Sequence, residues 1–476
     1  MTTARRRPPH VLLFICDQMQ QQRLGVHDPL SHTPELDRLV REGILYTHVH
    51  SSNGQCVPSR ASMQTGLYPH EVGVMIIYGF HDHTAHLTGS ERTVGHVFRD
   101  AGYTTAFFGK THFGTTLESL GYQQGSEGPR GGGEGERAAR AAGRRHRVSE
   151  TDRRIVDDAL TFLRDHDPDV PLFLSVSIHE PHPPFELVER FADRFPLERM
   201  PVPESFRGDD LSAKPAFHRE HVADGRHGYP TASDEDKRRL RAELRQYYTM
   251  ISNVDALFGR VRAAFEAKGM WERTAALFTS DHGDMMGAHR MRLKGTIPYD
   301  ETFRIPFIVK LPDGSPAPAR TVVDDLACNV SQPGTLVEAA GLPAPPGFKG
   351  GSLLPAAYRP AAPAQEEVFF EHYGAYWGLH PFRAIRVRDA RRGEWKLAKY
   401  YGPDAGQLEL YDLCADPHEI TNRAGDPTLA EWRAQLERRV DDWWERTGGR
   451  DFEYYESPAF KQSGAATLTD RRQRPD

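Results

Sequence analysis

Cysteine is scarce in this chain of 476 residues, which contains only Cys16, Cys56, Cys328 and Cys414. The four are widely separated and form no C-x-x-C pair, which argues against a disulfide framework and against a zinc site of ordinary spacing. No apolar run is long enough to cross a membrane. The net charge of −6 gives no electrostatic footprint for nucleic acid. We therefore expect neither a nucleic acid nor a membrane as a partner.

The start of the chain lacks the features of a secretory signal. Met1–Pro9 is basic, but the apolar run after it, Val11–Cys16, is too short for the core of a signal peptide and precedes no small-residue cleavage site. The run leads directly to Asp17, a candidate site residue. This pattern favours a cytoplasmic location.

Short apolar runs alternate with segments of helical periodicity over most of the chain. The runs are apolar on both faces, as in covered central strands, and lie at His10–Cys16, Thr104–Phe108, Pro171–Ile178, Ala275–Thr279 and Pro306–Leu311. The helical segments lie at Thr33–Glu42, Arg60–Thr65, Thr93–Ala101, Glu150–Asp165 and Asp234–Lys268. The alternation predicts an α/β fold with a large, mainly parallel, doubly wound sheet flanked by helices.

The character of the sequence changes past about residue 360. Strand-like runs follow at Glu367–Phe370, Phe382–Val387, Trp395–Tyr401 and Leu408–Leu413, with a helical pattern after Pro427. We predict a larger α/β domain over residues 8–355 and a smaller C-terminal α+β subdomain, containing an antiparallel sheet, over residues 360–476.

Two segments interrupt the alternation of strands and helices. Gln123–Arg147 is rich in Gly, Arg and Glu and has almost no large apolar residue, so it is predicted to be a surface loop. Ser205–Pro230 is predicted to be an irregular insertion. We expect its histidines, His218, His221 and His227, to lie at the surface.

Cys56 opens the eleven-residue string Cys56-Val57-Pro58-Ser59-Arg60-Ala61-Ser62-Met63-Gln64-Thr65-Gly66. The string resembles the signature of the type I, formylglycine-dependent sulfatases of the alkaline phosphatase superfamily, in which the Cys of C-x-P-S-R is oxidised after translation. The resemblance implies that a formylglycine-generating enzyme converts Cys56. A hydrated aldehyde attacks through one hydroxyl, and the second hydroxyl then expels sulfate, so release is part of the covalent chemistry. The alternative is a buried or metal-bound thiol.

Further segments resemble the same family, in the family's order. They are His10–Gly25, Gly109-Lys110-Thr111-His112, His179–Phe185, Thr279–Asp284, Lys294–Gly295, Tyr299–Glu301, Arg304–Pro306 and Leu410–Asn422. Each fragment is weak alone, whereas the ordered set beside the cysteine motif is specific. The resemblance spans residue 8 to about residue 425 and makes residues 8–355 the catalytic domain.

The candidate metal ligands follow predicted strands, where sites form in open α/β sheets. They are Asp17, Gln18, Asp281 and His282, together with the group at Cys56. Oxygen-rich sets of this kind favour a hard divalent cation, Ca²⁺ as first choice with Mn²⁺ or Mg²⁺ as alternatives. Gln18 departs from the many family members that have a second Asp here. Asp-Gln combined with Asp-His resembles choline-sulfatase-like and phosphonate monoester hydrolase-like members.

Three basic residues are candidates for handling negative charge. Arg60 lies one helical turn after Cys56 and is expected to reach back to the aldehyde hydrate. Lys110 and Lys294 are expected to bind oxygens of the nucleophile and of the sulfate in the transition state.

Three histidines are candidates for proton transfer and substrate contact. His112 stands two residues beyond Lys110 and suits the base that collapses the sulfated intermediate. His182 suits proton donation to the leaving-group oxygen. His179 is an alternative donor or a substrate-binding residue.

The function predicted from the sequence is hydrolysis of an organic sulfate ester, from a small molecule or a saccharide, releasing inorganic sulfate. One alternative is a phosphonate monoester or phosphodiester hydrolase that uses the same apparatus. Another is a catalytically silent protein that binds sulfated glycans. Specificity is expected in loops such as Met75–Thr88, whose aromatic and histidine side chains are Tyr78, Phe80, His81, His83 and His86.

Overall fold

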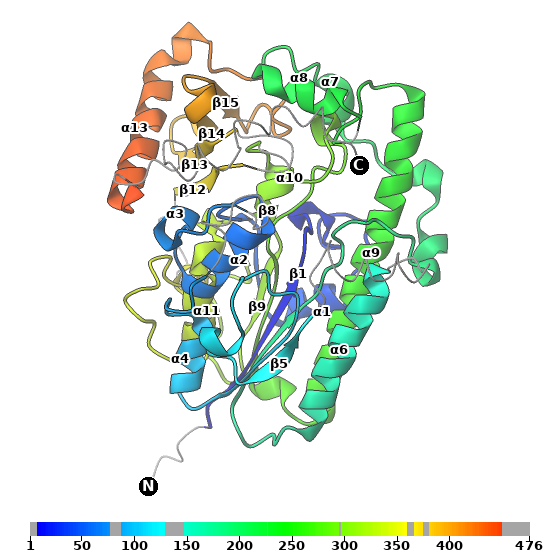
Figure 1. Ribbon diagram of the computed structural model, residues 1–476, viewed down its shortest axis with the longest axis vertical. Coiled ribbons are helices and arrows are strands. Elements are labelled where there is room, and N and C mark those ends of the chain that lie inside the picture. Colours follow the sequence, from blue (N-terminus) through cyan, green and yellow to red (C-terminus); the bar gives the residue numbers. More distant parts are fainter. Residues whose placement is uncertain are drawn as a thin grey trace.

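The computed structural model describes residues 7–76, 87–128, 147–225, 227–294, 297–358, 366–374 and 380–449. The side chains of the Met75–Thr88 loop that were singled out above therefore lie outside the described residues. Within the described part, no helix is long and apolar enough to cross a membrane. The described residues form two main sheets of different kinds, each covered by helices, and one small three-stranded sheet (Figure 1).

The larger sheet has eight strands in the order β10-β2-β9-β7-β1-β6-β4-β5. Their bounds are β1 His10–Cys16, β2 Ile44–Tyr46, β4 Thr104–Gly109, β5 Gln124–Glu127, β6 Leu172–Ser177, β7 Thr274–Ser280, β9 Phe307–Lys310 and β10 Val322–Val323. Strands β7, β1, β6, β4 and β5 are mutually parallel, whereas β9 runs antiparallel to β2 and β7. The predicted fold class, a mainly parallel sheet flanked by helices, is confirmed.

Helices cover both faces of this sheet. One face packs against α1 (Pro34–Glu42), α6 (Val148–Asp165) and the long α9 (Asp234–Ala267), and the other against α2 (Cys56–Thr65), α4 (Val94–Asp100) and α11 (Gln332–Ala339) (Figure 1). Successive side chains of β1 alternate between the two cores, Leu12 and Phe14 on the α9 side and Val11 and Leu13 on the other. A strand buried on both faces is apolar throughout, which is why β1 was recognisable in the sequence.

The remaining short elements connect the layers. Strands β3 (Val49–His50), β8 (Arg304–Ile305) and β11 (Ala327–Cys328) form a small sheet beside the larger one. The short helices are α3 Pro69–Val72, α7 Glu204–Gly208, α8 Ala216–Ala223, α10 Asp300–Phe303 and α12 Leu354–Tyr358.

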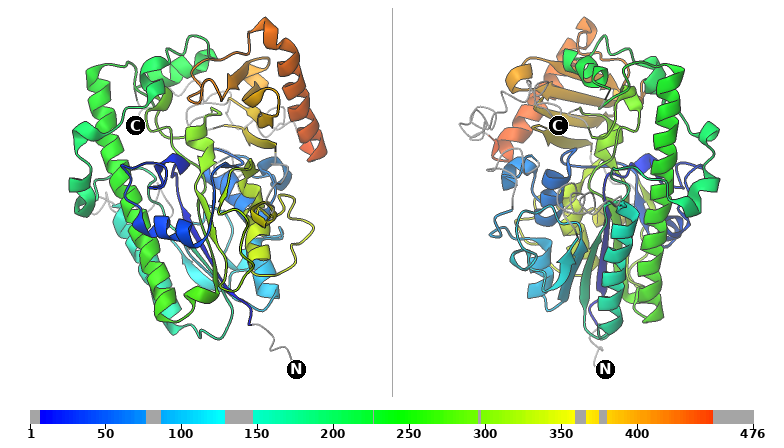
Figure 2. Two further views of the ribbon diagram at one scale, coloured as in Figure 1. Left: turned by 180° about the vertical axis from the view of Figure 1, so that it is seen from behind. Right: turned by 45° about the vertical axis from the view of Figure 1, so that its right-hand side comes forward.

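The second unit is a four-stranded antiparallel sheet in the order β12-β13-β14-β15. Its strands are β12 Glu367–His372, β13 Phe382–Asp389, β14 Gly393–Tyr400 and β15 Leu408–Asp412, and α13 spans Ala430–Arg446. Phe369 and Ile385 face α13, whereas Phe370 and Ala384 face Phe303 of α10, so the sheet is buried on both sides. It lies beyond the carboxyl ends of the large sheet (Figure 2). The predicted C-terminal antiparallel sheet is confirmed, and the boundary between residues 355 and 360 stays a prediction.

Three local predictions were wrong. In the segment 123–147, predicted to be a loop, Gln124–Glu127 forms the edge strand β5, and residues 129–146 lie outside the described residues. The insertion 205–230 is partly helical, in α7 and α8. His218 is buried, not superficial, because its Nε2 meets Glu409 of β15 at 3.0 Å; His221 and His227 are half-buried.

Candidate active site

Four ligand-bearing side chains meet at the carboxyl ends of β1 and β7. Asp17 follows β1, Asp281 and His282 follow β7, and Cys56 is the first residue of α2. One potential ligand atom from each lies within 4.8 Å of the others, and all four residues are buried. Because β1 and β7 are parallel neighbours, their carboxyl ends place these residues side by side. The structure brings together the group that the sequence predicted.

Helix α2 begins earlier than the sequence suggested, at Cys56 in place of Arg60. Pro58 lies within its first turn. The first N–H groups of a helix have no partner within it, so a proline in the first turn loses no hydrogen bond. The thiol consequently stands at the positive end of α2 and beside the strand ends.

The Cys56 sulfur is surrounded by cationic and polar groups. Its Sγ lies 3.1 Å from Nζ of Lys294, 3.1 Å from Nε2 of His282 and 3.8 Å from Nζ of Lys110. Burial raises the pKa of the thiol, but these groups outweigh burial and lower that pKa below its ordinary value. Position 56 therefore stabilises negative charge, as a nucleophile requires.

Arg60 and Lys110 hold the two carboxylates in place. The Arg60 guanidinium donates to Asp281 Oδ2 at 2.7 Å and to Asp17 Oδ2 at 3.3 Å, and Lys110 Nζ donates to Asp17 Oδ2. Burial alone would raise the pKa of Asp17, but the nearby cations, Lys110 first, hold it well below its usual range. Arg60 also donates to Ser177 Oγ at 2.7 Å. Its contact with a hydrate at position 56 stays a prediction.

Gln18 lies beside the four-residue group and is restrained at both ends of its amide. Its Oε1 accepts from Lys294 Nζ at 2.8 Å, its Nε2 donates to Asp284, and its backbone N–H donates to Asp281 Oδ1 at 3.1 Å. Asp284 is buried, and burial raises its pKa. The amide oxygen of Gln18 thus faces the cations near Cys56.

The donor set fits a divalent cation. Two carboxylates, one amide oxygen and one imidazole are gathered, and Nδ1 of His282 meets the Gly283 carbonyl at 2.8 Å. That hydrogen bond leaves Nε2 as the ligand atom of His282. Oxygen-dominated ligands of this kind suit Ca²⁺, Mg²⁺ or Mn²⁺.

His112 and His182 lie beside the same group. His112 adopts a left-handed backbone with a φ of 55°, so the segment after Lys110 is not an extended strand. Its charged neighbours include Lys110, Arg60 and Asp17. His182 Nδ1 lies 2.6 Å from the Pro183 carbonyl oxygen. With Nδ1 engaged there, Nε2 is the ring nitrogen that can meet a substrate. Burial first, then Lys294, holds the pKa of His182 well below its usual range.

His179 follows β6. Its ring is held at Nδ1 by a residue that was not singled out from the sequence. Its Nδ1 lies 2.9 Å from Oδ1 of Asp152, a buried residue of α6. Ser177 was also missed, although a serine at the end of an apolar strand was a signal that could have found it. Asp152 had no such signal, because only the packing of α6 on β6 brings it to this place.

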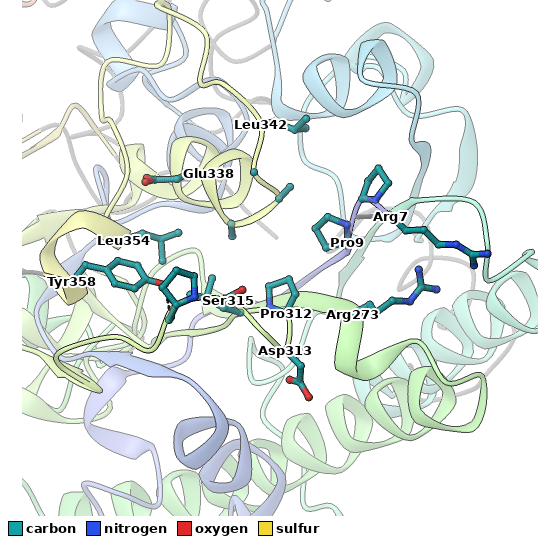
Figure 3. A pocket seen from close by; sticks show the side chains of 16 residues that line it. Arg7, Pro9, Arg273, Pro312, Asp313, Ser315, Glu338, Leu342, Leu354 and Tyr358 are labelled. Carbon is teal, nitrogen blue, oxygen red and sulfur yellow. Dashed lines mark hydrogen bonds between the residues drawn. The ribbon is translucent and has the colours of Figure 1, made fainter. Parts of the chain in front are cut away.

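A separate cavity of about 860 Å³ lies away from these residues (Figure 3). It is lined by Pro8 and Pro9 before β1, by Arg273 before β7 and by residues such as Leu354 and Tyr358. These positions are at the amino ends of β1 and β7. Active sites of open α/β sheets form at the opposite, carboxyl ends, so this cavity is not the candidate active site.

Two models of known protein families match this chain. The family model described as Sulfatase matches residues 9–342, and the model described as N-sulphoglucosamine sulphohydrolase, C-terminal, matches residues 287–446. The chain belongs to the sulfatase family, and it is an enzyme of the hydrolase class.

Individual relatives match over nearly the whole chain. The ulvan-active sulfatase of Formosa agariphila is 26% identical over 457 residues, which cover 91% of this chain and 80% of that protein. A solved structure in complex with its substrate D-glucosamine-2-N,6-O-disulfate has a TM-score of 0.76 at 20% identity, covering 94% of this chain and 100% of the other. The phosphonate monoester hydrolase of Agrobacterium radiobacter has a TM-score of 0.73 at 23% identity, covering 92% and 96%. At these identities the two structural likenesses show the fold alone.

Proposed function

We propose that this chain hydrolyses an organic sulfate ester to an alcohol and inorganic sulfate, using a formylglycine made from Cys56. The observation that carries the proposal is the position of the Cys56 sulfur, within 4 Å of His282, Lys294, Lys110 and Asp17. The match of residues 9–342 to the sulfatase family supports it.

A divalent cation, Ca²⁺ as first choice, would be held by Asp17, Gln18, Asp281 and His282. When bound, it supplies positive charge that polarises a sulfate oxygen and acidifies a neighbouring hydroxyl. Arg60 keeps the two carboxylates aligned through its hydrogen bonds to both. Release of sulfate needs no additional nucleophile, because the second hydroxyl of a hydrated aldehyde at position 56 reforms the carbonyl.

Lys110 and Lys294 bind the sulfate oxygens in this proposal. Both ammonium groups are buried and both approach the Cys56 sulfur, so they meet charge that develops on either side of the bond being broken. Preorganised donors in a buried site act strongly because they need no reorientation during the reaction.

His112 and His182 handle the protons. His112 takes a proton from residue 56 when sulfate is released. His182 protonates the leaving-group oxygen through Nε2, since Nδ1 is engaged by the Pro183 carbonyl. Burial first, and then Lys294, lowers the pKa of His182, and the negative charge of a bound sulfate ester acts in the opposite direction by raising that pKa.

The substrate class that we propose is a saccharide or small-molecule sulfate ester. The structural relative bound to a disulfated glucosamine motivates a saccharide. A phosphonate monoester or phosphodiester is the second candidate, because Gln18 replaces a carboxylate and a phosphonate monoester hydrolase shares the fold. We also propose that the formylglycine-generating enzyme is a partner and that residues 8–355 form the catalytic domain.

The test is a parallel assay on protein coexpressed with a formylglycine-generating enzyme. Sulfated sugars, choline sulfate, aryl sulfates and phosphonate monoesters should be compared by kcat/KM, and peptide mass spectrometry should measure conversion of Cys56. We expect sulfate esters to be preferred. Preference for phosphonate monoesters would favour the second candidate, and full activity with an unmodified thiol would refute the mechanism.

A further inference from the structure

Asp152 is a buried carboxylate that accepts three hydrogen bonds from two consecutive residues. Its Oδ1 receives the backbone N–H of His179 at 2.8 Å and the ring Nδ1 of the same residue at 2.9 Å. Its Oδ2 receives the backbone N–H of Glu180 at 2.6 Å. The residue lies on α6, and its partners lie just beyond the carboxyl end of β6. A buried carboxylate needs such donors to offset the loss of water.

The contact with Nδ1 determines how His179 presents its ring. Because Nδ1–H donates to Asp152, Nε2 is the one ring atom through which His179 can bind or protonate a substrate. The two backbone contacts fix the turn itself, and the N–H of His182 closes that turn on the His179 carbonyl at 2.9 Å. The positions of His179 and His182 therefore both depend on the three hydrogen bonds of Asp152, which we call the clamp.

The neighbouring Glu180 is a second buried acid. Burial, and then Asp152, raises its pKa well above the usual range, and its Oε2 accepts from Asn253 Nδ2 at 2.5 Å. The three N–H groups described above all donate to Asp152 and not to Glu180. The Glu180 carbonyl also accepts the N–H of Asp17 at 3.2 Å, which connects the clamp to the metal-ligand group.

We propose that Asp152 is a positioning residue of the active site, which fixes the ring of His179 and the turn that carries His182 against the leaving group of the ester. This inference rests on the proposed function. It assigns to the His179–Asp152 pair the task of holding the leaving-group side of the substrate. Asp152 itself touches no reacting atom.

The experiment is a double-mutant cycle on the converted holoenzyme. Asp152→Asn keeps the size of the side chain. It replaces one carboxylate oxygen, a hydrogen-bond acceptor, by an NH₂ group, which then faces an N–H donor of His179 or Glu180. We expect kcat/KM to fall roughly tenfold to 100-fold, as when carboxylates that orient functional histidines are removed. In a His179→Ala background the same change should cost less than about twofold, because coupled residues are non-additive. In a His182→Ala background the same change should still lower kcat/KM through the ring of His179, but by less than in the parent, because the turn that carries His182 also depends on Asp152.

A second readout does not depend on activity. Ring ¹⁵N shifts of His179 in the full chain, assigned with His179→Ala, should show Nδ1 protonated in the parent and a changed tautomer or titration in Asp152→Asn. Asp157→Asn on the exposed side of the same helix, where Asp157 pairs with Arg260 at 2.6 Å, is the matched control and should change neither readout. Asp152→Ser, which still accepts one N–H, provides a second variant if Asp152→Asn fails to fold.

The results test the role of Asp152 separately from the proposed function. An equal loss with and without His179, together with an unchanged ring spectrum, would make Asp152 a purely structural residue and overturn the proposal. If no ester is hydrolysed at all, the proposed function fails. The ring spectrum still reports whether Asp152 orients His179.

Discussion

The active site and the interface between the two sheets each bury a cluster of charged side chains. At the interface, Lys396 of β14 extends Nζ to Asp300 Oδ1 at 2.6 Å, Glu419 Oε1 at 2.7 Å and the Pro298 carbonyl at 2.9 Å. Arg386 of β13 also pairs with Asp300. Each cation of this interface network meets a fixed acceptor that belongs to the protein.

The active-site cluster is balanced differently. Of its three cations, Arg60 and Lys110 contact the carboxylates Asp17 and Asp281, whereas Lys294 Nζ contacts the Gln18 amide oxygen and the Cys56 sulfur. Charges that exceed their partners are costly to bury, and a site with a surplus of positive charge attracts an anion. The comparison indicates that the interface network is complete by itself, whereas the active-site cluster is completed by an anionic substrate.

The largest effect is expected from removing the group at the centre of the active-site cluster. Cys56→Ala should reduce turnover roughly 10³-fold or more, since covalent catalysis depends on this residue. Cys414→Ser, at an exposed cysteine, is the matched control and should leave turnover unchanged. Initial rates on an aryl sulfate, with mass spectrometry of residue 56, measure the effect. A Cys56→Ala variant that retains turnover would refute covalent catalysis at this site.

A matched pair of lysine substitutions sharpens the comparison most directly. Lys294→Met removes the ammonium group that contacts Cys56 and Gln18, and it should lower kcat/KM about 10²-fold to 10³-fold with a small effect on stability. Lys396→Met removes the cation that pairs with Glu419 and one of the cations that pair with Asp300, and should lower the free energy of unfolding by about 3–5 kcal/mol. Its turnover well below the unfolding temperature should change little. Denaturant unfolding and steady-state kinetics on both variants provide the test. Equal losses in the free energy of unfolding would show that the two clusters do not differ in this way.

Removing the cation tests whether the active-site carboxylates serve a ligand. Chelation should abolish turnover and lower the melting temperature, and Ca²⁺, Mn²⁺ or Mg²⁺ should restore both. A ligand at 100 times its Kd stabilises a protein by about 2.7 kcal/mol. Asp281→Asn should weaken the response, whereas Asp300→Asn, in the interface network, should leave it intact. Undiminished turnover by protein shown to be metal-free by elemental analysis would exclude the proposed ligands.

The sequence predicted the active-site cluster far better than the interface network. Asp17, Asp281 and His282 directly follow strands that are apolar on both faces, so the rule for carboxyl ends of parallel strands brings them together. The partners of the interface network have no such rule. His218 and Glu409 are 191 residues apart and meet only because β15 packs over α8, so a histidine in an irregular segment was taken for a surface residue.

Local elements that depend on a neighbour were missed for the same reason. β5 contains Gly125 and polar side chains, and it is a strand only because it pairs with β4 at the edge of the sheet. Asp152 has an ordinary helical sequence context, and its role appears only when α6 lies against the end of β6. Patterns within one segment predict strands and helices, whereas contacts between distant segments decide which polar residues work together.

Proton donation within the active site should depend on the leaving group. His182→Ala should lower kcat/KM by about 10²-fold for alkyl or sugar sulfates, whose alkoxides leave poorly, and far less for activated aryl sulfates. His112→Ala should slow release of sulfate from the enzyme for both kinds of ester, giving a burst of alcohol close to one equivalent. Single-turnover kinetics distinguishes the two. Equal losses for both ester types in His182→Ala, with no burst in His112→Ala, would show that the roles are assigned wrongly.

The smallest effect concerns His372 of β12, which is buried at the sheet interface and stacks on Phe382 with ring centroids 5.7 Å apart. Burial, together with His380, lowers its pKa from 6.5 to about 3. The unfolded chain therefore binds more protons than the folded chain between these values, and stability falls as pH falls from 6.5 toward 3. His372→Phe should flatten that part of the stability–pH curve, whereas the exposed control His418→Asn should not. Denaturant unfolding between pH 7 and pH 4 gives the measurement; an unchanged slope in His372→Phe would mean that this buried imidazole does not contribute to acid sensitivity.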